Sequence, residues 1–479
     1  MAISRSINAE VQRPAVELAN GSSRRDAVPS SQSYSGAQST AAIPPASSSA
    51  SQGTVPAETP LPLGFNVVMN LYFFLMGANY TVVLPTVSQY TKSLGGGYWT
   101  AGLIVALFMG PSIVTSPLAP YLVRWKYMPL VVVAIVSQFV GSVLYGLGQV
   151  ANSLALVLLA RLIAGFTAMG PMLYLFIDAT SQCAHRKFRT ATVARRNNSA
   201  FFGMGMGPVI AAGLSHLHFS IGDLKVDEYT SPGWLFAVLW VLLLGALVLV
   251  PEPRRLFEHE SDADAAGSPN PQTHRATLVS LAWCCFTIVA TSAAISVWET
   301  SAAIVTQQTF GWPLLWSSLF IGALFLSSTI GGEIVRACRG RIKEADVVVA
   351  SLAGVVLSSL FLFWYLPEHP SDLALIGGGE IPYVLGGVLV LNAANIGRTF
   401  ATTLAQRAAS AEGAKLRKRT TVAISMSQAL GRTIGALIGL GAMTLKGGVN
   451  VVAAFICFCS FVALLSLLPP QPRGILRET

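Results

Sequence analysis

The chain has 479 residues, of which 53% are hydrophobic and only 11% are charged. Soluble proteins carry roughly 25% charged residues, so this composition excludes a water-soluble globular fold. The net charge is +9, but basic residues in short loops between apolar spans are first of all a signal of membrane topology. We therefore expect a multi-pass protein of the lipid bilayer with no nucleic-acid partner.

The first segment, residues 1–60, is rich in Ser, Ala and Pro and has Tyr34 as its only aromatic residue. It cannot bury enough apolar surface to fold on its own, so we expect a disordered cytoplasmic tail. Its acids Glu10, Glu17 and Asp26 are untypical of an organellar transit peptide, and we expect the tail to stay on the mature protein.

Charge-free runs follow the tail, and each is long enough for the roughly 20 residues that span the hydrocarbon of a bilayer. Together with Pro, Gly and polar breaks, they predict an all-α membrane fold of twelve transmembrane helices. The expected helices lie at about 63–87, 98–122, 129–150, 154–177, 199–219, 233–250, 276–305, 313–335, 346–366, 382–405, 421–445 and 449–468.

The stretch from Pro251 to Arg275 is acidic, contains Pro and Gly, and shows no periodicity, so it is typical of a linker between two six-helix halves. The expected organisation is a tail at 1–60, an N-terminal six-helix bundle at 61–251, a cytoplasmic linker at 252–275, a C-terminal six-helix bundle at 276–468 and a cytoplasmic tail at 469–479.

The distribution of Lys and Arg predicts the orientation of the helices. With the N-terminus in the cytoplasm, 25 basic residues fall on the inner side, and only Lys92, Lys225 and Lys446 fall on the outer side. Cytoplasmic loops carry an excess of Lys and Arg, so we expect both termini in the cytoplasm. No address motif distinguishes a vacuolar or lysosomal-type membrane from the plasma membrane.

Two glycine-rich helices indicate that the halves repeat each other. A basic stretch precedes each of them. Both carry small residues at four-residue spacing, offset by 228 positions: Gly203, Gly207 and Ala211 in the fifth helix, and Gly431, Gly435 and Gly439 in the eleventh. A parallel repeat of six-helix halves is an architecture of secondary transporters.

Three motifs relate the chain to the major facilitator superfamily. RLIAGFTAMG at 161–170 resembles the family's fourth-helix motif, an Arg followed four residues later by Gly, and GMGMGPVIAAG at 203–213 resembles its fifth-helix Gly-Pro motif. The loop PLAPYLVRWKYMPL keeps basic residues of the family as Arg124 and Lys126 but has no acid. The resemblance implies two six-helix pseudo-repeats, with helices one, four, seven and ten lining a central pathway.

The chain more closely resembles the branch that contains vacuolar phosphate transporters and a lysosomal relative linked to neuronal storage disease. The resembling stretches are NYTVVLPTVSQYTKSLG at 79–95, WETSAAIVTQQTFGW at 298–312 and SMSQALGRTIG at 425–435. Phosphate transporters of that branch carry an added phosphate-sensing domain, for which residues 1–60 are too short. Where plant-type members have basic residues late in helix four, residues 170–174 are Gly-Pro-Met-Leu-Tyr.

Three arginines fall within expected spans: Arg161 in helix four, Arg398 in helix ten and Arg432 in helix eleven. Charged side chains in spans are costly, so they usually face a cavity or a partner. A guanidinium stays ionised and forks onto carboxylate or phosphate oxygens, which makes all three candidate ligands of an anionic substrate. The alternative is that they bind carbonyls or a carboxylate and pin two helices together.

Glu299 is expected late in helix seven, in the outer half of the membrane. A buried carboxyl group that gains and loses a proton during transport would couple the solute to protons. The alternative is a fixed ion pair with one of the arginines.

Charges at helix ends predict a cytoplasmic gate. Arg124 ends helix two and Asp178 ends helix four, while Glu333, followed by Arg336, is expected to form the corresponding latch in the second half. The alternative is that these charges set the orientation and never meet.

Small residues in helices five and eleven predict close packing against neighbouring helices, with a hinge as the alternative. A proline inside a helix also removes a hydrogen bond. The residues concerned are Gly203, Gly207, Pro208, Gly431 and Gly435.

No nucleophile–base arrangement, phosphate-cradling glycine loop or nucleotide-binding motif occurs, so we expect neither an enzyme nor an ATP-driven pump. The six cysteines and six histidines form no ligand set, and no metal or other cofactor is expected. The sequence thus predicts a monomeric secondary active transporter of a small anionic solute, with protons as a candidate coupling ion. An anion channel on the same fold and a transport-dead membrane sensor or scaffold are the alternatives.

Overall fold

Helices account for almost all of the chain that the structure describes. The computed structural model describes residues 62–122, 127–168, 170–183, 186–217, 219–221, 224–250, 271–337, 343–363, 379–445 and 447–466. The expected tails at 1–60 and 469–479, and most of the expected linker, lie outside the described residues. All described residues belong to one unit by their contacts, Ala57–Thr479.

The first half contains the elements up to the expected linker. They are α1 (Leu63–Thr81), α2 (Val87–Ser93), α3 (Tyr98–Met109), α4 (Pro111–Thr115), the 3₁₀ turn η1 (Ser116–Leu118), α5 (Ala119–Leu122), α6 (Tyr127–Leu147), α7 (Leu154–Gly165), α8 (Gly170–Cys183), α9 (Arg186–Leu214), the strands β1 (Phe219–Ile221) and β2 (Leu224–Val226), and α10 (Ser231–Val248). The two short strands pair antiparallel.

The second half follows the same alternation of long helices. Its elements are α11 (Pro271–Ile304), the π-helical turn η3 (Val305–Thr309), α12 (Leu314–Ala337), α13 (Glu344–Ser359), the 3₁₀ turn η4 (Leu360–Leu362), α14 (Glu380–Ala411), α15 (Ala414–Ala442) and α16 (Gly448–Leu465).

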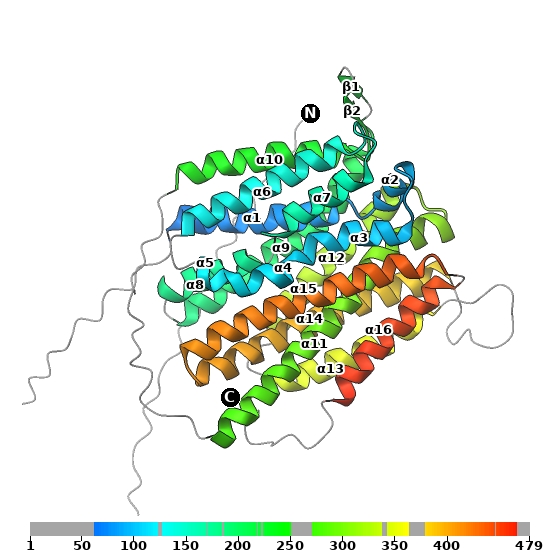
Figure 1. Cartoon of the computed structure of the whole chain (residues 1–479). Helices are drawn as coiled ribbons and strands as arrows, with labels where there is room; N and C mark the ends of the chain where they lie inside the picture. Colours follow the sequence, from blue (N-terminus) through cyan, green and yellow to red (C-terminus); the bar gives the residue numbers. More distant parts are fainter. Residues whose placement is uncertain are drawn as a thin grey trace, which may run out of the picture. The chain divides into compact units, whose positions relative to one another are not determined.

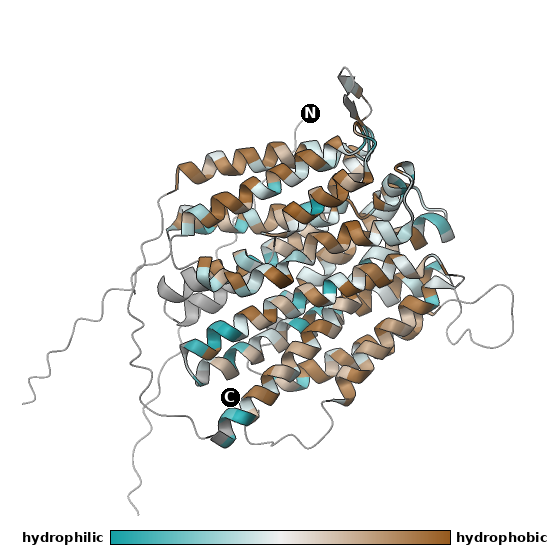
Figure 2. Ribbon diagram, in the orientation of Figure 1, coloured by the Kyte–Doolittle hydropathy of each residue, from teal (hydrophilic) through white to brown (hydrophobic). Residues whose placement is uncertain are grey.

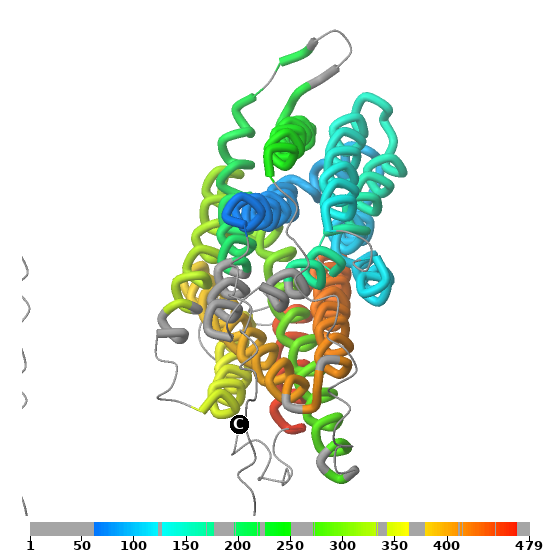
Figure 3. The backbone as a smooth tube through the Cα atoms, turned by 90° about the vertical axis from the view of Figure 1, so that its left-hand side faces the viewer, coloured from blue at the N-terminus to red at the C-terminus, as the bar shows by residue number. Residues whose placement is uncertain are grey.

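The helices run back and forth between two ends. We call the end where α10 finishes and α11 begins the linker end, and the opposite end, with β1 and β2, the hairpin end; they lie to the left and right of Figure 1. The first-half helices α1, α6, α7 and α10 form one group and α11, α13, α14 and α16 another, as the turned view in Figure 3 also shows. Between the groups α9 packs on α12 and α3 packs on α15.

The described chain contains nine helical segments long and apolar enough to cross a membrane. The other long helices are α1, α9 and α15, which pack beside these segments. When they are included, the path of the chain is compatible with the predicted twelve transmembrane helices. Figure 2 shows apolar residues along the helices and hydrophilic residues concentrated at the linker-end starts of α11 and α15. This distribution is typical of helices that span a bilayer.

Several expected helices differ in the structure, and four of them show the physical reasons. The basic stretches before the fifth and eleventh helices are helical, so α9 begins at Arg186 and α15 at Ala414. Lys, Arg and Ala are good helix formers, and a charge-based boundary stops short of them. The first and fourth expected helices are interrupted, since α1 ends at Thr81 before Pro85, and α7 ends at Gly165 before α8 begins at Gly170.

Glycines bring two pairs of helices into close contact, as their spacing predicts. A Cβ atom on Gly203 would strike the Phe74 carbonyl oxygen of α1, and one on Gly207 would lie 2.6 Å from the Ala78 oxygen. In the second half, a Cβ on Gly435 would lie 2.6 Å from the Ala293 oxygen of α11. Thus α9 packs on α1 as α15 packs on α11, and the repeat seen in the sequence is a repeat of contacts.

Candidate functional site

Five charged side chains are buried in the described part of the chain: Arg161, Arg196, Glu299, Arg398 and Arg432. Four are cations and one is an anion, so the described interior has a surplus of positive charge. Ionisable groups inside transmembrane segments are rare and usually functional.

An ion pair lies where the two halves meet. The Arg432 Nη1 atom of α15 lies 2.9 Å from Glu299 Oε1 of α11, and both side chains are fully buried. The Tyr80 hydroxyl of α1 donates a hydrogen bond to the same carboxylate oxygen. The guanidinium also lies 5.2 Å from the centre of the Tyr80 ring. These residues form what we call the axial cluster: Tyr80, Glu299, Arg432 and Met204 of α9.

Met204 places this cluster on the pseudo-symmetry axis. The Arg432 Nη2 atom approaches the Met204 Sδ atom at 3.6 Å. The two residues are offset by the same 228 positions as the paired glycines, so they occupy equivalent places in the two repeats. Their backbones confirm this, because Thr81 Oγ1 donates to the Met204 carbonyl and Ser296 Oγ donates to the Arg432 carbonyl. Equivalent residues touch each other only at the axis.

Two polar atoms of the axial cluster keep hydrogen-bonding capacity. Within the described part of the chain, Glu299 Oε2 and Arg432 Nε have no hydrogen-bond partner. A carboxylate with a spare oxygen can accept a proton, and a guanidinium with a spare N–H can donate to an anion. The arrangement therefore provides one cation and one titratable acid at the same place.

Arg398 also connects the halves. Its Nη2 atom donates to Asn395 Oδ1 at 2.8 Å, one turn earlier in α14. Its guanidinium lies 4.8 Å from the centre of the Phe201 ring in α9 of the first half. No carboxylate pairs with Arg398 among the described ion pairs, and the ring face supplies part of the compensation for its charge.

Arg161 lies elsewhere. Its Nη1 atom donates to the Asn79 carbonyl oxygen at 3.2 Å, and its guanidinium lies 4.8 Å from the centre of the Tyr145 ring and 5.2 Å from that of Phe108. All these contacts are with the first half. The carboxylate that sequence reasoning considered as its fixed partner, Glu299, is paired with Arg432 instead.

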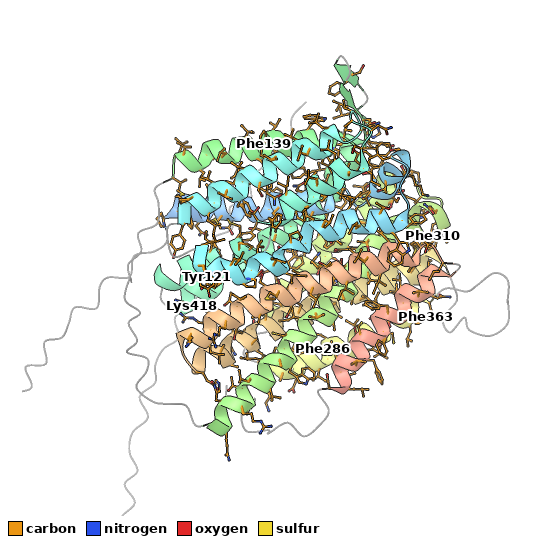
Figure 4. All side chains as sticks on the ribbon, in the orientation of Figure 1. Tyr121, Phe139, Phe286, Phe310, Phe363 and Lys418 are labelled. Atoms are coloured by element: carbon orange, nitrogen blue, oxygen red, sulfur yellow. The ribbon has the colours of Figure 1, made fainter. Side chains whose placement is uncertain are left out.

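Polar contacts close both ends between the halves. At the hairpin end, Gln89 Nε2 lies 3.2 Å from Gln307 Oε1 of η3, and Tyr98 donates to Gln308 at 2.8 Å. Towards the linker end, the Ser116 and Ser425 hydroxyl oxygens are 3.1 Å apart. Figure 4 marks the two ends by Phe310 and Phe363 on one side and by Tyr121 and Lys418 on the other.

The expected gate residues are only partly within the described chain. Arg124 lies outside it, and so do the side chains of Asp178 and Arg336. Glu333 of α12 accepts a hydrogen bond from Asn198 of α9, which is a contact between the halves. Pro208 is a buried residue inside α9.

Sequence reasoning missed three features of the interior. Arg196 lies in the basic stretch before the fifth expected helix, yet it is 5% exposed and lies 4.7 Å from the centre of the Phe73 ring. Tyr80 and Met204 gave no signal, because an uncharged residue in an apolar span does not stand out. The offset of 228 from Arg432, together with a glycine on either side, was the one available indication for Met204.

The Major Facilitator Superfamily matches residues 69–436 of the chain. The chain belongs to this family. It is therefore a multi-pass integral membrane protein of a transporter family rather than an enzyme. Solved structures agree on the fold: a D-xylose-proton symporter superposes with a TM-score of 0.69 at 14% identity, covering 86% of this chain and 98% of that one. The human organic anion transporter MFSD10 superposes with a TM-score of 0.59 at 18% identity, covering 84% of this chain and 100% of that one.

Curated relatives include plant membrane proteins with an SPX domain. One from Arabidopsis thaliana is 32% identical over 187 residues, which is 38% of this chain and 25% of that protein. One from Oryza sativa subsp. japonica is 28% identical over 193 residues, which is 39% of this chain and 26% of that protein. The match thus spans about a quarter of the length of these relatives.

Proposed function

We propose that the protein is a secondary active transporter of a small anionic solute and that it works by alternating access. The observation that carries the proposal is the position of Arg432, a fully buried cation on the axis between two pseudo-repeats. Transporters built from such repeats bind their solute near the midplane at the repeat interface. The described surroundings of this site hold more arginines than acidic residues. This surplus of positive charge favours an anion as the solute.

Arg398 and Arg432 are the proposed solute ligands at this interface. A guanidinium presents several N–H groups in a plane, so it can hold a carboxylate or phosphate group through two hydrogen bonds. Glu299 already occupies one side of Arg432. An incoming anion and Glu299 would therefore compete for the same cation.

This competition couples the solute to a proton. When Glu299 takes up a proton it loses its charge and its strong attraction to Arg432, and the anion can replace it. When the anion leaves, Arg432 recovers the carboxylate and the proton is released. Anion and proton then cross in the same direction, so uptake should rise as the pH on the donor side falls.

Solute counterflow into liposomes tests the proposal. A thermal-shift screen against inorganic anions, organic acids, sugars and amino acids first identifies the solute, because a ligand of the folded state raises its stability. A carrier then exchanges labelled for unlabelled solute, a channel supports only electrodiffusive flux, and a sensor binds without flux. Glu299→Gln should keep exchange but lose its pH dependence. A stabilising ligand that is neutral or cationic would refute the anionic solute.

We also propose that the linker end faces the cytoplasm. Lys92 and Lys225 lie in elements of the hairpin end, whereas the basic starts of α9 and α15 lie at the linker end. Cytoplasmic ends carry more Lys and Arg. An impermeant reagent added to intact cells or vesicles from the non-cytoplasmic side should label a tag inserted beside Lys225 and spare tags at either terminus; the reverse labelling would overturn the orientation.

A further inference from the structure

A small cavity lies inside the first half, away from the axial cluster. It is enclosed by α1, α6, α7 and α10, and its polar lining comes from Asn79, Ser142, Tyr145 and Arg161. The rest of the lining consists of small or apolar residues: Val83, Gly141, Ala160, Ala164, Pro232 and Gly233. Glycines and alanines on three of the four helices leave the space that larger side chains would fill.

Arg161 lines this cavity with hydrogen-bonding capacity to spare. The residue is 4% exposed, and its Nη1 atom donates to the Asn79 carbonyl. The guanidinium also interacts with the Tyr145 hydroxyl, but its Nε and Nη2 atoms and that hydroxyl make no hydrogen bond of good geometry in the described part of the chain. N–H groups of Arg161 and the O–H group of Tyr145 are thus left to donate around one cavity.

Among the described residues, no acid lines the cavity. The ring faces of Tyr145 and Phe108 compensate part of the guanidinium charge, but such contacts are worth far less than an ionic partner. A buried cation without a counter-charge is strongly unfavourable. Other polar groups of the lining are engaged, since Asn79 Nδ2 donates to Gln138 and Ser142 Oγ donates to the Gln138 carbonyl. The spare groups are therefore mainly donors, and a ligand that only accepts hydrogen bonds matches them better than water.

The size of the cavity limits the ligand. The cavity has a volume of about 10 Å³, which is the space of roughly one water molecule. Phosphate, sulfate and carboxylate groups need more room than this. We propose that the cavity is a binding site for a single monatomic anion such as chloride, held by Arg161 and Tyr145.

The site differs from the proposed solute site in place and in role. The residues that line the cavity all belong to the first half. The proposed solute site lies between the two halves and becomes accessible when they move apart. The anion neutralises Arg161, whose Nη1 atom holds the backbone of α1 at Asn79, and thereby stabilises the packing of α1 against α6, α7 and α10. It is thus a resident ion of the first bundle and not the transported solute.

Thermal unfolding of the purified full-length chain tests this site. Chloride is titrated against gluconate at constant ionic strength, and bromide, phosphate and sulfate are compared at equal concentrations. Chloride and bromide should raise the midpoint of unfolding saturably and through Arg161, whereas any rise with phosphate or sulfate comes from the solute site or from general salt stabilisation and should persist in Arg161→Gln. Absence of a saturable halide shift in the wild-type chain would overturn the proposal.

Two variants locate the ion. Arg161→Gln should abolish the chloride-dependent shift, and Tyr145→Phe, which removes a single donor, should weaken the apparent chloride affinity roughly tenfold. The matched control is Arg196→Gln, which removes a buried arginine outside both the cavity and the proposed solute site and should keep the full chloride shift. If Arg161→Gln does not fold, the result for Tyr145→Phe decides by itself. A shift unchanged in Tyr145→Phe, or lost in Arg196→Gln, would refute the assignment.

Discussion

The opposite charges of Glu299 and Arg432 neutralise each other in one ion pair, and the Tyr80 hydroxyl donates a hydrogen bond to the same carboxylate. Their equivalents in the first half are uncharged: Met204 stands where the second half has Arg432, and the register of the glycine contacts aligns Leu84 with Glu299. The first half therefore shows how the fold packs these two positions without charge. The matching replacements in the second half are therefore Glu299→Leu and Arg432→Met.

Replacing the ion pair by the residues of the first half should separate stability from transport. Glu299→Leu alone leaves a guanidinium that cannot lose its proton, and we expect a loss of about 3–5 kcal/mol. Arg432→Met alone should cost less, and less still at low pH, because Glu299 can then be neutralised by protonation. The double variant should recover most of the stability while lacking transport.

Thermal unfolding of the four chains, measured across pH, checks this prediction. A double variant as unstable as the sum of the single variants would show that the two residues do not act as a pair. Retained counterflow in the double variant would remove Arg432 from the solute site.

At the residue scale, the sequence located every buried charge of the axial cluster but not the pairing between them. Charges in apolar spans are conspicuous because they are costly, so Glu299 and Arg432 could be found one at a time. Which arginine meets the glutamate depends on how helices from two halves rotate about their axes, and a single sequence contains no record of that. Arg161 and Arg432 were equally good candidates until the fold assigned them to different places.

Helices α9 and α15 cross α1 and α11 at glycines. Their close packing there depends on the absence of a side chain on those glycines. Around Gly207 a Cβ atom would lie 2.6 Å from the Ala78 oxygen and 2.8 Å from the Val82 nitrogen. At Gly213, six residues later in the same helix, a Cβ atom would meet nothing within 4 Å. The same helix thus offers a crowded glycine and an open one.

Alanine at these two positions should act in opposite directions. We expect Gly207→Ala to destabilise the protein by about 1–3 kcal/mol because the helices must separate. Gly213→Ala should be neutral or stabilise by up to about 1 kcal/mol, because alanine favours the helix. Gly207→Leu should abolish transport. Equal unfolding midpoints for the two alanine variants would show that backbone contact does not hold α9 on α1.

Element boundaries show where sequence reasoning reaches its limit. The four-residue glycine spacing predicted the crossing points of α9 and α15, since that spacing places small residues on one helix face. The basic starts of both helices fall outside the expected spans, because charge marks where a span leaves the membrane but not where a helix ends. The break between Gly165 and Gly170 likewise lies inside an apolar run without a charge to reveal it.

For the molecule as a whole, contacts between the halves are present at both ends. Those described at the hairpin end join neutral side chains, Gln89 to Gln307 and Tyr98 to Gln308, and Ser116 meets Ser425 towards the linker end. Neutral hydrogen bonds are worth about 1 kcal/mol each, so the hairpin end can open at modest cost, whereas the hydrogen bond from Asn198 to the charged Glu333 also joins the halves. The sequence predicted the two halves and their repeat, and of the charged gate residues that it pointed to, Glu333 takes part in a contact between the halves.

Cross-links at the two ends test whether both must open. In a chain whose native cysteines are replaced, Ser116→Cys with Ser425→Cys should form a disulfide, and Gln89→Cys with Gln307→Cys should be joined by a short bifunctional thiol reagent. We expect each link alone to stop counterflow, and reduction of the disulfide to restore it. Matched chains carrying one cysteine of each pair serve as controls. Undiminished exchange with either link in place would show that the linked end does not open.

The contact between Met204 and Arg432 also constrains the history of the chain. In an ancestor made of two identical halves, every residue on the axis would have faced its own copy, so an arginine there would have met an arginine in a buried setting. Like charges so close are strongly unfavourable. A single positive charge on the axis is therefore favoured by a difference between the two copies, with methionine in one and arginine in the other. The proposed solute site depends in this way on broken symmetry.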